Sequence, residues 1–186
     1  SSGNAASQVT RMVTVEDNCQ TTGDVVTFPD PSLEAVIREA LVRPQGDIYE
    51  ENLRMLTELD ASASGISDIA GLAYLTGLVV LDLRSNEIDD LSPLPLLNPG
   101  ALVLLDDNLI VDPSPLLAAA DGNGGIEFTL GNNLLESRAY CSSFPALLAL
   151  GNDVYHHVDP NDLSFVPFFN TNLACLNPDD DFDSDN

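Results

Sequence analysis

The chain has 186 residues, of which 30 are acidic and six are basic, and its formal net charge is −24. Because proteins hold nucleic-acid phosphates with cationic surfaces, this charge argues against a nucleic-acid partner. It also disfavours adsorption to anionic membranes. The hydrophobic fraction of 44% suffices for a folded core, and no apolar run reaches the roughly 20 residues that span a bilayer. We therefore expect neither nucleic-acid binding nor membrane insertion.

The N-terminal part of the chain predicts a flexible segment followed by a helical cap. Residues 1–24 begin with small polar residues and are expected to be flexible. In the predicted cap, residues 25–56, Asp30 is a suitable N-cap and Pro31 suits the first helical position. A second helical turn is expected over 50–56. The apolar residues of the first helix recur at helical spacing: Leu33, Val36, Ile37, Ala40 and Leu41.

Residues 57–135 carry an internal repeat with a period of 22 residues, in about four copies. Aliphatic residues recur eight, five and three positions before a polar anchor, and two, five and eight positions after it. The anchors are Ser64, Asn86, Asn108 and Asn133, the last displaced by three extra residues. The weak fits to the pattern are Ala61, Gly100 and Pro113.

The spacing within each unit predicts its conformation. The L-x-L step has period two, so both leucines point to one face of a short strand. The asparagine side chain follows the strand and can bond backbone groups of adjacent turns. The later period-three step suits a 3₁₀ or short helical return. A single unit is too thin to bury its apolar face, so neighbouring units must stack.

A C-terminal cap is predicted over residues 136–158, with an irregular acidic tail over 159–186. A helix over 136–150 would place Tyr140, Phe144, Leu147 and Leu148 together, and Gly151 would stop it. Val154 and Tyr155 are expected to pair as a last strand. These elements would close the second end of the stack.

Two features of the C-terminal third have competing interpretations. Cys141 and Cys175 flank the end of the patterned region and are predicted to form a disulfide, with Cys19 left over; the alternative is free buried thiols. Asp181, Asp183 and Asp185 have the D-x-D-x-D spacing of a calcium loop, but Asn186 stands where the loop has its glycine, and a solvated acidic tail is the preferred interpretation. No other cofactor is expected.

Several stretches resemble bacterial internalin-like leucine-rich-repeat proteins. Residues 81–94 (LDLRSNEIDDLSPL) are similar to one of their repeats, and residues 56–62, 65–69 and 71–76 are similar to a first repeat. The N-terminal cap helix and the terminal unit are also similar, so the resemblance covers roughly residues 27–156. It implies an α/β solenoid, or horseshoe, with parallel strands on the concave face, a helical N-terminal cap and a helix-containing C-terminal cap. Ser64, Gly100 and Pro113 depart from the family pattern.

Strand alternation identifies the residues that would face the concave surface. Val80, Leu102 and Leu104 would form an apolar spot inside an acidic rim, and such patches often mark contact surfaces. Solvent-facing leucines without a function are the alternative. The predicted ligand-binding positions are Glu58, Asp60, Ser62, Val80, Asp82, Arg84, Leu102, Leu104, Asp106, Glu127 and Thr129.

The resemblance implies protein recognition outside the cell, and the chain contains no GxSxG, HExxH or P-loop motif of an enzyme. We therefore expect a non-enzymatic, secreted or cell-surface module that binds a protein through its concave face, as a monomer. One alternative is a spacer or adhesion segment of a larger bacterial surface protein, with or without dependence on calcium. Another is a domain attached to an enzyme.

Overall fold

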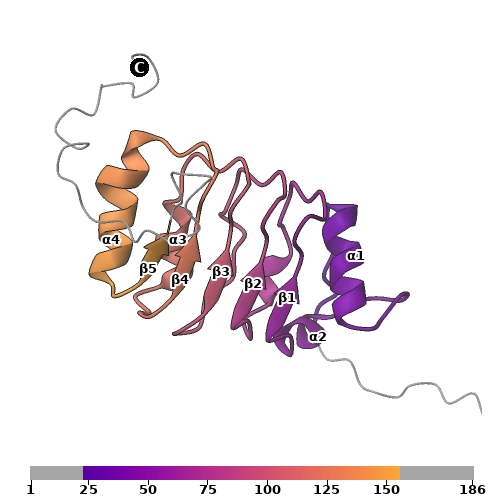
Figure 1. Cartoon of the computed structure of the whole chain (residues 1–186). Coiled ribbons are helices and arrows are strands. Elements are labelled where there is room, and N and C mark those ends of the chain that lie inside the picture. Colours follow the sequence, from indigo (N-terminus) through magenta and orange to yellow (C-terminus); the bar gives the residue numbers. More distant parts are fainter. Residues whose placement is uncertain (1–22, 156–186) are drawn as a thin grey trace, which may run out of the picture.

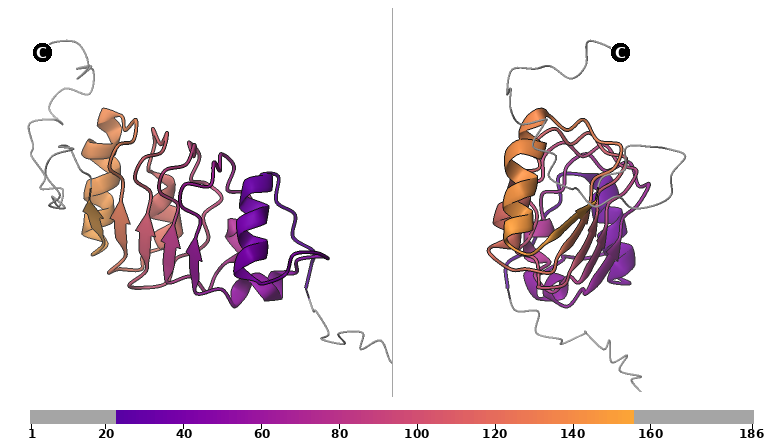
Figure 2. Two further views of the ribbon diagram at one scale, coloured as in Figure 1. Left: turned by 45° about the vertical axis from the view of Figure 1, so that its right-hand side comes forward. Right: turned by 60° about the vertical axis from the view of Figure 1, so that its left-hand side comes forward.

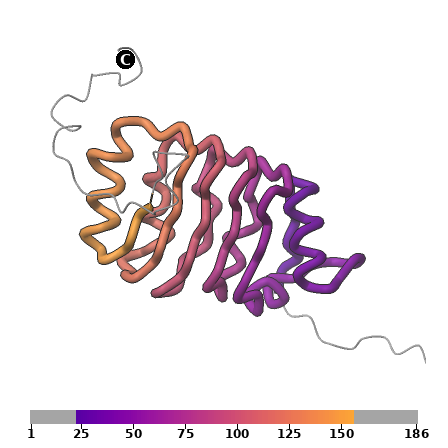
Figure 3. Tube along the Cα trace, viewed as in Figure 1, coloured from indigo at the N-terminus to yellow at the C-terminus, as the bar shows by residue number. Residues whose placement is uncertain are grey.

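The computed structural model describes residues 23–155, which form a stack of coils joined by one parallel sheet (Figure 1). The strands pair in chain order, and every pairing is parallel. They are β1 (Glu58–Asp60), β2 (Val80–Asp82), β3 (Leu102–Leu104), β4 (Glu127–Thr129) and β5 (Asp153–Tyr155). The trace in Figure 3 shows each coil lying against the next. The predicted α/β leucine-rich-repeat solenoid is confirmed, including the last strand.

The middle residue of each strand points into the core. These inward residues pair in register across the sheet and are at most 2% exposed: Leu59, Leu81, Val103, Phe128 and Val154. The first two steps, from 59 to 81 to 103, have the 22-residue period, and the last two are longer. Because a parallel register stacks identical positions, the short L-x-L pattern becomes one continuous apolar column.

The N-terminal cap consists of α1 (Pro31–Ala40) and α2 (Glu50–Arg54), which lie against the first coil (Figure 2). Leu33 and Ile37 of α1 and Leu53 of α2 are completely buried. The first helix ends at Ala40, where Leu41 closes it as C-cap. The helical turn predicted over residues 50–56 is present as α2.

Asp30 links the cap to the first repeat. Its Oδ1 accepts hydrogen bonds from the N–H groups of Ser32 (2.8 Å) and Leu33 (3.3 Å), which makes it the predicted N-cap of α1. Its Oδ2 accepts from the N–H groups of Ser67 (2.8 Å) and Asp68 (3.2 Å), a contact that the sequence did not indicate. Burial raises the pKa of Asp30, but these four N–H donors outweigh burial and hold the pKa below the ordinary 3.8.

Replacing Asp30 by asparagine is expected to lower the free energy of unfolding at pH 7 by about 1–3 kcal/mol, because an amide cannot accept on both sides. A depressed folded pKa contributes stability above the unfolded pKa, and this contribution is lost as the pH falls through the folded pKa. The difference between wild type and variant should therefore shrink below pH 3.8. Urea denaturation across pH 2–7 measures it. The exposed Asp89→Asn is the control, and a pH-independent difference contradicts the assignment.

Three asparagines connect neighbouring coils through their side chains. Asn86 donates from Nδ2 to the carbonyls of Ala61 and Leu83 (both 2.9 Å) and accepts at Oδ1 from the N–H groups of Ser64 (3.1 Å) and Ile66 (3.0 Å). Asn108 and Asn133 repeat this arrangement one and two coils later. Each asparagine reaches back by one coil.

The backward reach explains why the first anchor is a serine. Ser64 has no repeat before it to reach back to, and the cap instead contacts this coil through Asp30, which accepts from the N–H groups of Ser67 and Asp68. The departure of Ser64 from the repeat pattern therefore marks the first coil, which has only the cap before it. At the other end Asn152, which precedes β5 instead of following a strand, contacts the coil before it, because its Oδ1 accepts from the N–H of Ile126 (3.1 Å).

The returns between strands differ from coil to coil. The first contains a 3₁₀ turn, η1 (Leu72–Tyr74), and the third contains a helix, α3 (Pro115–Ala120). The second, between β2 and β3, has neither. Pro113 is buried and fills its apolar position, whereas Gly100 is an exposed turn residue with a φ of 77°. Ala61 is also fully buried, so of the three weak fits only Gly100 is a real break in the pattern.

The C-terminal unit contains a π-helical turn, η2 (Ala139–Ser143), which continues into α4 (Phe144–Ala149). The regular helix therefore begins later than the predicted 136, although its core residues Phe144 and Leu147 are fully buried as expected. Tyr140 packs edge-on against Phe144 with ring centroids 5.4 Å apart. Cys141 is disulfide-bonded.

Several predictions fall outside the described residues. The pairing of Cys141 with Cys175 stays a prediction, because Cys175 lies there. The same holds for the calcium candidates Asp181, Asp183 and Asp185 and for the acidic tail.

Candidate functional site

The outward-facing side of the sheet, here called the sheet face, consists of the strand residues that alternate with the buried column. Two rows cross the strands in register. The first row contains Glu58, Val80, Leu102, Glu127 and Asp153, and the second contains Asp60, Asp82, Leu104, Thr129 and Tyr155. Ser62, Arg84 and Asp106 continue the face beyond the strands. These residues include every predicted ligand-binding position.

An apolar patch occupies the centre of the sheet face. Val80 and Leu102 are register partners on β2 and β3, and Leu104 lies two residues beyond Leu102 on the same side of β3. All three are half-buried, in contrast to the fully buried residues between them. Helix α3 lies behind the sheet in Figure 1, on the side opposite this patch. The register thus places these three residues side by side, and their role in binding stays a prediction.

Carboxylates surround the patch. Glu58 and Asp60 are exposed on one side, and Glu127 and Asp153 are exposed on the other. Partial burial raises the pKa of Tyr155, and the charges of Asp153 and Glu127 raise it further. Asp153 and Tyr155 were missing from the predicted site. The expected last strand contained the signal, because alternation about Val154 places both neighbours outward.

One cation lies within this acidic surface. Arg84 forms a salt bridge with Asp82, with 2.6 Å between Nη2 and Oδ2, and its Nε donates to both Asp82 oxygens at 3.0 and 3.1 Å. The hydrogen bond to Asp82 raises the pKa of Arg84 against an opposing effect of burial, and the carboxylates of Asp106 and Asp60 raise it further. Arg84 is thus an internal counterion shared by three neighbouring coils.

Two predicted contact residues have mainly internal partners. Thr129 is 4% exposed, and its hydroxyl donates a short hydrogen bond to Oδ2 of Asp106. Asp106 also accepts from the N–H of Gly131 at 2.7 Å. Asp82 is 8% exposed and holds Arg84. Thr129 and Asp82 therefore lie on the sheet face, but they expose little surface to a partner.

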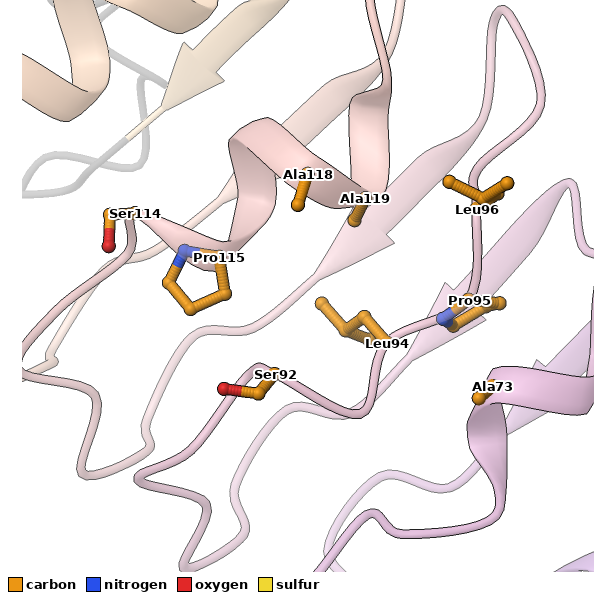
Figure 4. A pocket seen from close by; sticks show the side chains of 9 residues that line it. All are labelled: Ala73, Ser92, Leu94, Pro95, Leu96, Ser114, Pro115, Ala118 and Ala119. Carbon is orange, nitrogen blue, oxygen red and sulfur yellow. The ribbon is translucent and has the colours of Figure 1, made fainter.

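An open, shallow depression lies on the side of the solenoid that is formed by the returns between strands, here called the return side. Its volume is about 520 Å³. Figure 4 shows the side chains that line it, with Leu94 and Pro95 between Ala73 and Ala118. It exists because the second return has no helix between η1 and α3: Pro93 and Pro95 remove backbone donors and disfavour helical neighbours. Leu96, at its edge, is 56% exposed. No charged residue lines it.

Within residues 23–155, no group of three or more His, Cys, Asp or Glu side chains is placed to hold a metal ion. Over the same residues, no helix has the length and apolar character that crossing a bilayer requires.

Comparison with known proteins supports the repeat assignment. The chain is 36% identical over 78 residues to Internalin H of Listeria monocytogenes. The match covers 41% of this chain and 14% of Internalin H. This chain carries internalin-like leucine-rich repeats. No family model matches it.

Two solved structures give partial matches to the internalin-like chain. The functional domain of InlJ from Listeria monocytogenes is 28% identical, with a TM-score of 0.48, over 62% of this chain and 26% of that one. Internalin C2 from the same species is 20% identical, with a TM-score of 0.42, over 69% of this chain and 77% of that one. The internalin-like chain thus spans only part of each of these relatives.

Proposed function

We propose that this internalin-like chain is a non-catalytic, secreted or cell-surface module that binds a protein through the sheet face. The observation that carries the proposal is the apolar patch of Val80, Leu102 and Leu104, three aliphatic side chains left half-exposed at the centre of a charged surface. Burial of such a centre under a partner removes apolar area from water, whereas the polar rim remains hydrated. The similarity to internalins supports a recognition role.

Replacing Leu102 and Leu104 together by serine is expected to weaken partner binding at least about tenfold, since each leucine contributes roughly 1.5–3 kcal/mol when buried. The partner is sought by affinity capture from bacterial-surface and host-cell extracts, with and without calcium, followed by quantitative mass spectrometry. Each identified protein is then titrated against the wild-type chain and the double variant.

Leu96→Ser is the matched control, because it makes the same substitution at an exposed leucine on the return side. Supporting proteins are captured by the wild type and by Leu96→Ser but lost with the double variant. Urea denaturation confirms that both variants are folded. Captured proteins that the double variant retains contradict the proposal and favour a spacer or a different surface.

A further inference from the structure

Resting on the proposed use of the sheet face, we infer the chemistry of its partner: an apolar side chain or cluster flanked on two opposite sides by cationic side chains. The flanks lie along the direction that crosses the strands. The inference follows from the order of charges in the first row of the sheet face and from the shortage of internal counterions for them.

The first row sets the spacing. Glu58, Val80, Leu102 and Glu127 occupy the same position on four consecutive strands, so two aliphatic residues separate two carboxylates. Neighbouring strands lie about 4.8 Å apart, so the two carboxylate positions are roughly 14 Å apart. Asp153 on β5 extends the acidic side by one further strand. A partner that covers the patch thus places its edges over negative charge on both sides.

Three of the carboxylates around the patch, Glu58, Glu127 and Asp153, form no ion pair within the described part of the chain. The ion pairs among residues 23–155 are formed by Arg38, Arg54 and Arg84, and none involves Glu58, Glu127 or Asp153. Arg84 already binds Asp82 and lies beside Asp60 and Asp106, a group whose net charge is negative. An anionic partner would be repelled here, whereas lysine or arginine at the partner's edges complements the rim.

The experiment selects partners without assuming a natural ligand. A yeast-displayed library of a small helical scaffold, randomised on one face, is selected against the whole wild-type chain, with the Leu102→Ser/Leu104→Ser variant as a counter-target. We expect enriched binders to carry an apolar centre with lysine or arginine on opposite sides. Glu58→Gln and Glu127→Gln should each weaken these binders roughly threefold to fivefold, and added salt should reduce the difference.

Glu136→Gln is the matched control, an identical charge change at an exposed residue outside the sheet face. If all three substitutions weaken binding equally, the binders respond only to the overall negative charge of the chain, and the inference is overturned. A double-mutant cycle between Glu127→Lys and a binder carrying glutamate at its flanking cation should restore binding if the two side chains meet.

The outcomes separate the inference from the proposed function. Binders that depend on Leu102 and Leu104 but carry no flanking cations, or ignore Glu58 and Glu127, overturn the inference and leave the sheet face as the binding surface. Selection that yields no binder sensitive to Leu102 and Leu104 contradicts both. Binders that lose affinity in the leucine variant and in both glutamine variants, but not in Glu136→Gln, support both.

Discussion

Asn86→Ala is expected to lower the free energy of unfolding by about 3–5 kcal/mol. The Asn86 side chain is 7% exposed and bonds backbone groups of two successive coils. Alanine leaves the N–H groups of Ser64 and Ile66 and the carbonyl of Ala61 without this partner. The carbonyl of Leu83 keeps its bond from Asn108. Each unsatisfied buried polar group costs about 1–3 kcal/mol. Partial access of water to the corner keeps the expected total below the sum for three such groups.

Urea denaturation monitored by circular dichroism measures this effect. The control is Asn132→Gly: Asn132 is exposed and has a φ of 53°, a conformation that glycine adopts without strain. We expect that control to change the stability by about 0.5 kcal/mol or less. If Asn86→Ala lowers the free energy of unfolding no more than Asn132→Gly does, the asparagine side chains do not hold the coils together.

Phe128→Ala is expected to lower the free energy of unfolding by a similar amount, about 3–5 kcal/mol. Phe128 is fully buried on β4, between its register partners Val103 and Val154. Truncation leaves a cavity between two coils, and the loss combines transfer of the ring with the remaining void. In a stack where each coil contacts its neighbours, the damage should be greatest near the cavity.

Two readouts test this prediction. Denaturation gives the stability, with the 62%-exposed Leu134→Ala as a control expected to remain within about 0.5 kcal/mol of wild type. Hydrogen exchange should increase more in β3, β4 and β5 than in α1 and β1, because the cavity uncouples the C-terminal coils first. Uniform acceleration along the chain would show that the solenoid unfolds as one unit instead.

The repeat pattern predicted the core but not its tertiary contacts. Leu81 and Leu83 were assigned inward positions, and both are buried. Asp30 was assigned as a helix cap, yet its second carboxylate oxygen binds Ser67 and Asp68, over thirty residues away. That contact depends on how the cap packs against the first coil, and no pattern in the local sequence predicts this packing.

For the candidate site too, the sequence predicted which face each residue lies on but not how far its side chain is buried. Alternation predicted that Val80, Leu102 and Leu104 share one face, because a strand's two-residue period assigns faces without knowledge of neighbours. Thr129 and Asp82 received the same assignment, but the structure buries both through bonds to Asp106 and Arg84. These partners come from an adjacent coil in one case and from a folded-back side chain in the other.

The sequence by itself determined the coil period, the inward column and the outward apolar patch, because each depends only on spacing along one coil. The tertiary structure alone decided how much of each outward side chain remains accessible. It also decided that the second return leaves a hollow beside α3. Accessibility depends on side chains that meet across coils, and those meetings exist only after the coils have stacked.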